Sequence, residues 1–224
     1  SEALHSGLDL VAAVITWFAV KVSDKPADTD HQYGHGKIEN LSALIETILL
    51  LVTCIWIIYE AISRLASGKT HIEVSVWSYV VVISSIIIDY TRSRALLRVA
   101  KKHNSQALEA DALHFSTDIW SSAVVLLGLV SYDFGFFMAD SIAALGVAVI
   151  VVFVSVRLGR RAIDALLDKA PVGIHQKITQ ILMNNPEVLS YHDLRVRTAG
   201  ADHFVNVTIH VNPFMGISEA HQVS

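Results

Sequence analysis

Long apolar runs alternate with short polar segments over the first three quarters of the chain. Each run is close to the ~20 residues that a helix needs to cross a bilayer. The third run is the weakest, because its apolar part is short and Asp89 ends it. The pattern predicts an all-α transmembrane bundle with five helices in this chain, at residues 3–22, 41–66, 74–90, 108–131 and 137–158.

The pattern changes at Pro171 to that of a small soluble domain. An amphipathic helix is followed by two strand-like runs, and apolar and polar residues alternate along the second run, as in a half-buried strand. We therefore expect a membrane domain at residues 1–170 and a small α+β domain at residues 171–224, whose final strand would lie beyond Ser224. The expected elements are a helix at 173–185, strands at 190–198 and 203–212, and a second helix from about Ile217.

Composition supports a membrane protein. Hydrophobic residues make up 53% of the chain and charged residues only 17%. The net charge of −4 argues against nucleic acid as a partner. The single cysteine, Cys54, excludes an intrachain disulfide, and we expect it to be a small buried apolar residue.

Basic residues gather on one side of the predicted bundle. The connections on the other side hold only Arg64 and Lys69. The positive-inside rule places the basic side, and with it the C-terminal domain, in the cytoplasm. Five spans would leave the visible N-terminus outside, so we expect a sixth helix in the complete protein. The basic side holds Lys21, Lys25, Lys37, Arg92, Arg94, Arg98, Lys101, Lys102, Arg157, Arg160, Arg161 and Lys169.

Two predicted spans carry the same pair of ionisable residues. His114 and Asp118 lie four residues apart, and His5 and Asp9 repeat this spacing. On a helix this spacing puts both side chains on one face, with a rise of about 6 Å between them. Ionisable residues at membrane depth are costly and mark ion paths or proton relays. Two imidazoles and two carboxylates suit Zn²⁺. The alternative is that each pair is only hydrogen-bonded between helices, but its repetition favours a metal site.

A second group of candidate ligands lies in the loop at residues 21–40. Asp28, His31 and His35 are spaced at three and four residues, and Gly34 and Gly36 let the backbone fold them together. From spacing alone, a solvated polar loop explains the residues equally well.

On these residues the chain resembles the cation diffusion facilitator family, zinc-type exporters that exchange metal for protons. The two His/Asp pairs match the family's membrane site, and the segment Pro-Ala-Asp-Thr-Asp-His-Gln-Tyr-Gly-His-Gly-Lys at residues 26–37 matches its loop. The resemblance implies a six-helix bundle, a cytoplasmic ferredoxin-like or metallochaperone-like domain and a homodimer. By this match the chain lacks the first helix and the last strand.

The resemblance also implies further sites and contacts. Asp28, His31 and His35 fall on the family's loop zinc site, whose role is structural or a sensor of loading. Lys37 and Asp168 fall where the family forms an ion pair that ties the dimer together; two surface charges are the alternative. The histidines that fall on the zinc site of the cytoplasmic domain, and that would otherwise be ordinary exposed histidines, are His192, His210 and His221.

The chemistry of these residues fits transport. A histidine must be neutral to bind metal, so loading releases protons and acid reverses it. A full set of protein ligands leaves no open position for an activated water, and no His-Glu-x-x-His motif occurs, so we do not expect an enzyme. We expect a secondary transporter of the inner or plasma membrane that exports Zn²⁺ in exchange for protons by alternating access. The alternative is a membrane-bound metal sensor without transport.

Overall fold

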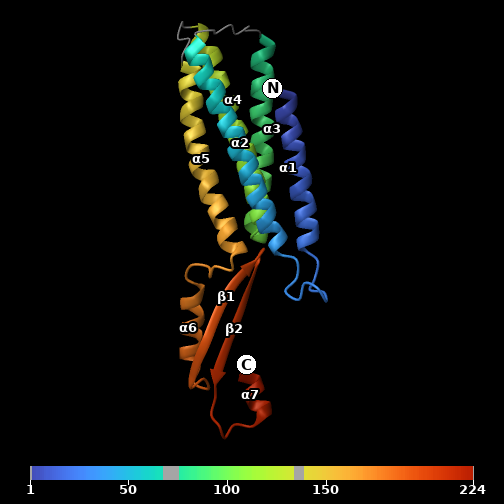
Figure 1. Cartoon of the computed structure of the whole chain (residues 1–224), viewed down its shortest axis with the longest axis vertical. Coiled ribbons are helices and arrows are strands. Elements are labelled where there is room, and N and C mark those ends of the chain that lie inside the picture. The colour runs from blue at the N-terminus through green and yellow to red at the C-terminus, as the bar shows by residue number, and fades with distance from the viewer. Residues whose placement is uncertain (1, 68–75, 134–138, 224) are drawn as a thin grey trace.

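The computed structural model describes residues 2–67, 76–133 and 139–223 and shows a helical bundle stacked on a small α+β domain (Figure 1). This order of elements agrees with the predicted fold class. The bundle consists of α1 (Glu2–Ser23), α2 (Lys37–Ser67), α3 (Val76–His103), α4 (Gln106–Asp133) and α5 (Ala139–Leu166). The second part consists of α6 (Ile174–Asn184), β1 (Ser190–Ala199), β2 (Asp202–His210) and α7 (Ile217–Val223).

The bundle has an apolar exterior and an interior of small residues. Large side chains such as Ile55, Trp77 and Phe153 are exposed, whereas Ala43 and Ala162 are buried where helices meet. Small residues at helix contacts and large apolar ones outside are typical of helices that pack in lipid. Among the described residues, two helical segments are long and apolar enough to cross a membrane by length and composition, Lys37–Ser63 and Ile142–Leu166.

The helices pack mainly as two pairs, α2 with α5 and α3 with α4, and α1 lies against α2 and α4. A close approach between α2 and α5 is possible because Gly159 has no side chain. A Cβ added there would lie 3.0 Å from Thr47 Cγ2. These contacts bring α1, α2 and α4, which carry most of the buried polar residues, to one interior.

Two helices, α3 and α5, continue well past their predicted ends. The basic stretch after residue 90 was expected to be a connection, yet α3 continues to His103. Its residues include Arg, Ala, Leu and Lys, which are strong helix formers, so the helix continues where the lipid-compatible pattern stops. Similarly, α5 continues to Leu166 instead of ending at 158. The turn between α3 and α4 uses Asn104 at φ 51°, and the Leu108 N–H donates to Ser105 Oγ at 3.3 Å as an N-cap of α4.

The C-terminal part contains an antiparallel hairpin whose turn contacts the bundle. Strand β1 pairs with β2 from Ser190 opposite His210 to Ala199 opposite Asp202, with an irregularity between His192 and Arg195. Helix α6 packs on β1. These elements begin and end within two residues of the predicted ones. The hairpin turn points at the end of the bundle (Figure 1), where Gly200 N–H donates to Asn40 Oδ1 of α2 at 3.0 Å.

Candidate metal sites

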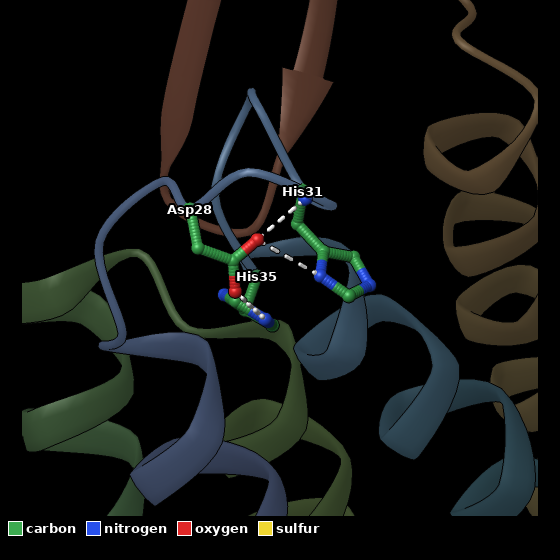
Figure 2. A group of neighbouring side chains, drawn as sticks. All are labelled: Asp28, His31 and His35. Carbon is green, nitrogen blue, oxygen red and sulfur yellow. Dashed lines mark hydrogen bonds and ion pairs between the residues drawn. The ribbon is translucent and has the colours of Figure 1, made fainter.

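The loop between α1 and α2 brings three candidate ligands together (Figure 2). The ligand atoms of Asp28, His31 and His35 all lie within 4.8 Å of one another. Asp28 Oδ1 is 3.2 Å from His31 Nδ1, and its Oδ2 is 3.5 Å from His35 Nε2. One carboxylate therefore lies between two imidazoles, a donor set that suits Zn²⁺ and leaves room for a fourth ligand. We call these three residues the loop triad.

Local backbone chemistry forms the loop triad. Asp28 Oδ1 accepts hydrogen bonds from the backbone N–H of Asp30 at 3.0 Å and of His31 at 2.5 Å, which is the side-chain-to-backbone turn that Asp favours. Gly34 then adopts φ 75°, a left-handed conformation that a residue with a Cβ rarely adopts. These two turns reverse the chain and return His35 to the carboxylate of Asp28.

The same hydrogen bonds set the charge of the loop triad. The backbone N–H of His31, above all, lowers the pKa of the Asp28 carboxyl from its ordinary value of 3.8. Asp28 is therefore ionised at neutral pH and available to a cation. The His35 side chain is only 11% exposed, and among the described residues its Nδ1 has no hydrogen-bond partner. The triad thus combines an exposed carboxylate with one shielded imidazole.

Helix α4 places the second candidate pair in the bundle. His114 Nε2 lies 3.8 Å from Asp118 Oδ2, as the spacing of four residues on a helix predicts. His114 is buried, and the Asp118 side chain is 19% exposed. The predicted partners His5 and Asp9 belong to α1, but their side chains lie outside the described residues. Because α1 packs against α4, the helices that carry the two pairs are neighbours. The convergence of all four side chains stays a prediction.

The hairpin brings together two of the three histidines predicted for the cytoplasmic domain. His192 Nδ1 on β1 lies 2.9 Å from His210 Nε2 on β2, and both side chains are near the surface. His221 belongs to α7 and is exposed. In the described ranges, the loop triad is the one group in which three ligand atoms lie within 4.8 Å. The structure thus brings together two of the three predicted ligands, and their binding of metal stays a prediction.

The structure also pairs Lys37 with Asp168 across the base of the bundle. Lys37 Nζ lies 2.9 Å from Asp168 Oδ1 and donates to the Leu166 carbonyl at 3.1 Å. The contact forms within one chain and links the start of α2 to the end of α5. Both side chains are more than a third exposed, so solvent screens the pair and its contribution to stability is small.

Sequence reasoning assigned no role to Glu46, which the structure buries inside the bundle. Its relative exposure is 5%, and its Oε1 accepts hydrogen bonds from the hydroxyls of Thr16 and Ser42. The sequence does show that Glu46 is an acidic residue inside a predicted membrane span. Because an ionisable residue there is energetically costly, its position alone makes it a candidate functional residue. Spacing did not identify its partners, because Thr16 is 30 residues away on another helix.

An α-helical bundle with an ionisable His/Asp pair inside, joined to a small α+β domain, is typical of membrane proteins that handle cations. Residues 1–167 match the family model of the cation efflux transmembrane domain, and residues 171–224 match that of the cation efflux protein cytoplasmic domain. The chain belongs to this family, the cation diffusion facilitators.

Curated relatives agree with the family models. The chain is 32% identical over 221 residues to the cation-efflux pump FieF of Yersinia enterocolitica, a match that covers 97% of this chain and 73% of the relative. It is 33% identical over 221 residues to the pump of the same name from Yersinia pestis strain Pestoides F, with the same coverage.

Proposed function

We propose that this protein exports divalent metal from the cytoplasm, and Zn²⁺ in particular, in exchange for protons. The observation that carries the proposal is the His114–Asp118 pair, which an α-helix of a cation efflux transmembrane domain holds 3.8 Å apart inside the bundle. The relatives are named cation-efflux pumps. His5 and Asp9 on the neighbouring helix α1 would complete a His₂Asp₂ transport site.

The donor set supports zinc and proton coupling. Two imidazole nitrogens and two carboxylate oxygens can surround Zn²⁺ tetrahedrally without water. Each histidine that binds the ion must be neutral, so a proton that arrives from the far side competes directly with the metal. Alternating access then needs only one site. The metal-loaded site and the protonated site open in turn to opposite sides of the membrane.

The remaining assignments belong to the same proposal. Residues 1–170 would form the membrane domain and residues 171–224 a cytoplasmic domain that joins two copies as a homodimer in the inner or plasma membrane. The match of residues 171–224 to the family's cytoplasmic domain supports the homodimer, because the resemblance to this family implies one. The loop triad would hold a structural or regulatory zinc ion. His192 and His210, with His221, would contribute to a zinc site in the cytoplasmic domain.

Transport into proteoliposomes tests the proposal. The full-length protein is expected to accumulate Zn²⁺ when a pH gradient is imposed, and to move protons in the opposite direction. Asp9→Ala and His114→Ala should each abolish both fluxes, because each removes a ligand of the transported ion. His175→Ala is the matched control, since His175 is exposed on α6 and belongs to none of the proposed sites. Unchanged flux in either ligand variant refutes the site. Zinc binding by a wild type that does not transport would favour a membrane-bound sensor.

A further inference from the structure

A buried polar cluster lies where α1, α2 and α4 meet. Its members are Thr16 on α1, Ser42 and Glu46 on α2, and Asp111 on α4. Thr16, Glu46 and Asp111 have relative exposures of 4%, 5% and 8%. Two carboxylates in the interior of a membrane bundle are costly unless a positive charge compensates them. Asp111 lies about one turn before His114 of the predicted His/Asp pair on α4.

Glu46 has an unused oxygen. Its Oε1 accepts both hydroxyl hydrogen bonds, from Thr16 and, at 3.1 Å, from Ser42. Its Oε2 is buried, and among the described residues it has no hydrogen-bond partner and Glu46 makes no ion pair. Buried polar atoms are normally paired, and a buried carboxylate normally meets a cation. The unpartnered oxygen therefore marks a position where a cation would be stabilised.

Thr16 connects Glu46 to a groove that Asp111 also lines. The Thr16 hydroxyl donates to Glu46 Oε1. Asp111 and Thr16 both line a groove of about 340 Å³ between α1 and α4, with Lys21 toward its end. Arg92 of α3, which lies over the Phe115 ring at 4.4 Å, and His114 also act electrostatically on Asp111. Asp111 thus has a guanidinium group among its electrostatic neighbours, whereas Glu46 has no cationic neighbour among the described residues.

The cluster lies between the hairpin end of the bundle and the proposed transport site. Thr16 is seven residues from the end of α1, Glu46 nine from the start of α2, and Asp111 five from the start of α4. At ~1.5 Å per residue these positions are about 8–14 Å inside the bundle. His114 follows Asp111 by about one turn on the same helix. A cation that enters by the groove from this end reaches the carboxylates before it reaches the His114–Asp118 pair.

We propose that Glu46 and Asp111 form an entry station that binds the divalent cation on its way to the His/Asp transport site. The inference rests on the proposed transport function. The carboxylate and hydroxyl oxygens of this cluster would bind Zn²⁺ more weakly than the site with two imidazoles deeper in the bundle, because imidazole nitrogen suits Zn²⁺ better than these oxygens do. The ion is therefore captured by charge at the station and passes inward to the tighter site. The station raises the local concentration of cation at a helix interface that would otherwise be apolar.

Glu46→Gln separates this role from a structural one. Glutamine keeps the size of the side chain and an oxygen that accepts from Thr16 and Ser42, but it removes the charge. The KM for Zn²⁺ uptake into proteoliposomes is expected to rise about tenfold or more, since ligand charge controls cation affinity by decades, while the maximal rate stays within about twofold. Glu109→Gln is the matched control, because Glu109 is paired with Arg161 at 2.7 Å and does not line the groove. Its KM should stay that of the wild type.

The outcomes distinguish the two proposals. If wild-type protein does not transport Zn²⁺, the proposed function fails before the station is tested. If the wild type transports and Glu46→Gln has an unchanged KM, the station alone is wrong and Glu46 only joins helices. An unchanged KM with fewer protons exchanged per zinc ion also overturns the metal station, because Glu46 then carries protons. Should Glu46→Gln fail to fold, Asp111→Asn must raise the KM in the same direction, and an unchanged value contradicts the proposal.

Discussion

The loop triad and the His114–Asp118 pair are built in opposite ways. The triad gathers three candidate ligands within eight residues of chain, and turns made by Asp28 and Gly34 bring them together. The α4 pair has a spacing fixed by one helix, and it would supply half of the proposed four-ligand set. A complete transport site depends on how α1 packs against α4. A metal site at the triad would therefore depend mainly on local turns, whereas a site shared by two helices could be opened and closed by their motion.

Exposure separates the two regions as well. The side chains of Asp28 and His31 are 50% and 58% exposed, so an ion there exchanges directly with solvent. His114 is buried, so an ion can reach it only along a path through the bundle. Charges in the interior are also screened less by salt than charges at the surface. The triad suits an ion that stays or reports, and the α4 pair suits one that is moved.

The largest effect that sharpens this contrast is loss of a ligand from the loop triad. His35→Ala removes the most shielded of the three candidate ligands. We expect it to weaken zinc binding at the loop by about 100-fold, a loss of affinity typical of substitutions at metal sites. Isothermal titration of the full-length protein should lose one tight zinc ion per chain. The maximal rate of Zn²⁺ transport should stay within about threefold, because the triad lies in a loop outside the helices of the bundle.

The matched control for that experiment is Asp30→Ala. Asp30 is also an exposed acid in the loop, but it contributes only its backbone N–H to the Asp28 carboxylate. Its variant should bind zinc as the wild type does. If His35→Ala abolishes transport while the tight ion stays bound, the separation between a resident loop ion and a transported ion is wrong.

The loop and the hairpin could be predicted from the sequence because their signals are local. The spacing of Asp28, His31 and His35 with two glycines placed the candidate ligands in one turn, and alternation along 203–212 identified β2. The helical spacing of His114 and Asp118 likewise sufficed to place both on one face. In each case the interacting residues are neighbours in the chain, so periodicity and turn chemistry contain the information.

Contacts between distant segments could not be predicted in this way. Nothing in the neighbourhood of Glu46 indicates that Thr16 donates to it, and nothing near Gly36 indicates that the hairpin turn lies against it. A Cβ added to Gly36 would be 2.6 Å from the Ala199 carbonyl oxygen, so this glycine is required by tertiary packing. The ends of α3 and α5 were missed for a different reason. Hydropathy detects the part of a helix that lies in lipid, while the hydrogen-bonded helix continues beyond it.

Acid provides the next test, with a smaller effect. Asp28 has a lowered pKa, so its hydrogen bonds stabilise the loop at every pH above the ordinary value of 3.8 and are lost only as the pH falls through the lowered value. Each imidazole must be neutral to bind zinc, so protons compete with the metal there. His31→Gln should therefore reduce the number of protons released when zinc binds in mildly acidic solution.

Asp28→Asn is the comparison for that measurement. It should weaken binding but leave the number of released protons unchanged, because Asp28 is already ionised before zinc arrives. Calorimetry in buffers of different ionisation enthalpy measures the proton number directly. If Asp28→Asn released one proton fewer per zinc ion, the Asp28 carboxyl would have to titrate near neutral pH. That result would contradict the conclusion that Asp28 is ionised before zinc binds.

The smallest effect concerns the contact that joins the loop to the hairpin. The guanidinium of Arg197 on β1 lies 3.6 Å from the ring centroid of Tyr33 and 5.5 Å from that of Phe204. Tyr33 lies between the two histidines of the triad in the sequence. Arg197→Lys keeps the charge but loses the planar group that stacks on the rings, at a cost of about 0.5–1 kcal/mol. Because this contact joins the loop to the hairpin, we expect zinc affinity at the triad to fall by about two- to fivefold. Arg195→Lys is the control, since Arg195 is 80% exposed and its ion-pair distance to Asp193 is 3.9 Å. An equal loss of zinc affinity in both variants would mean that charge on β1, rather than stacking on Tyr33, supports the loop. The triad would then depend more on distant packing than its short span of sequence implies.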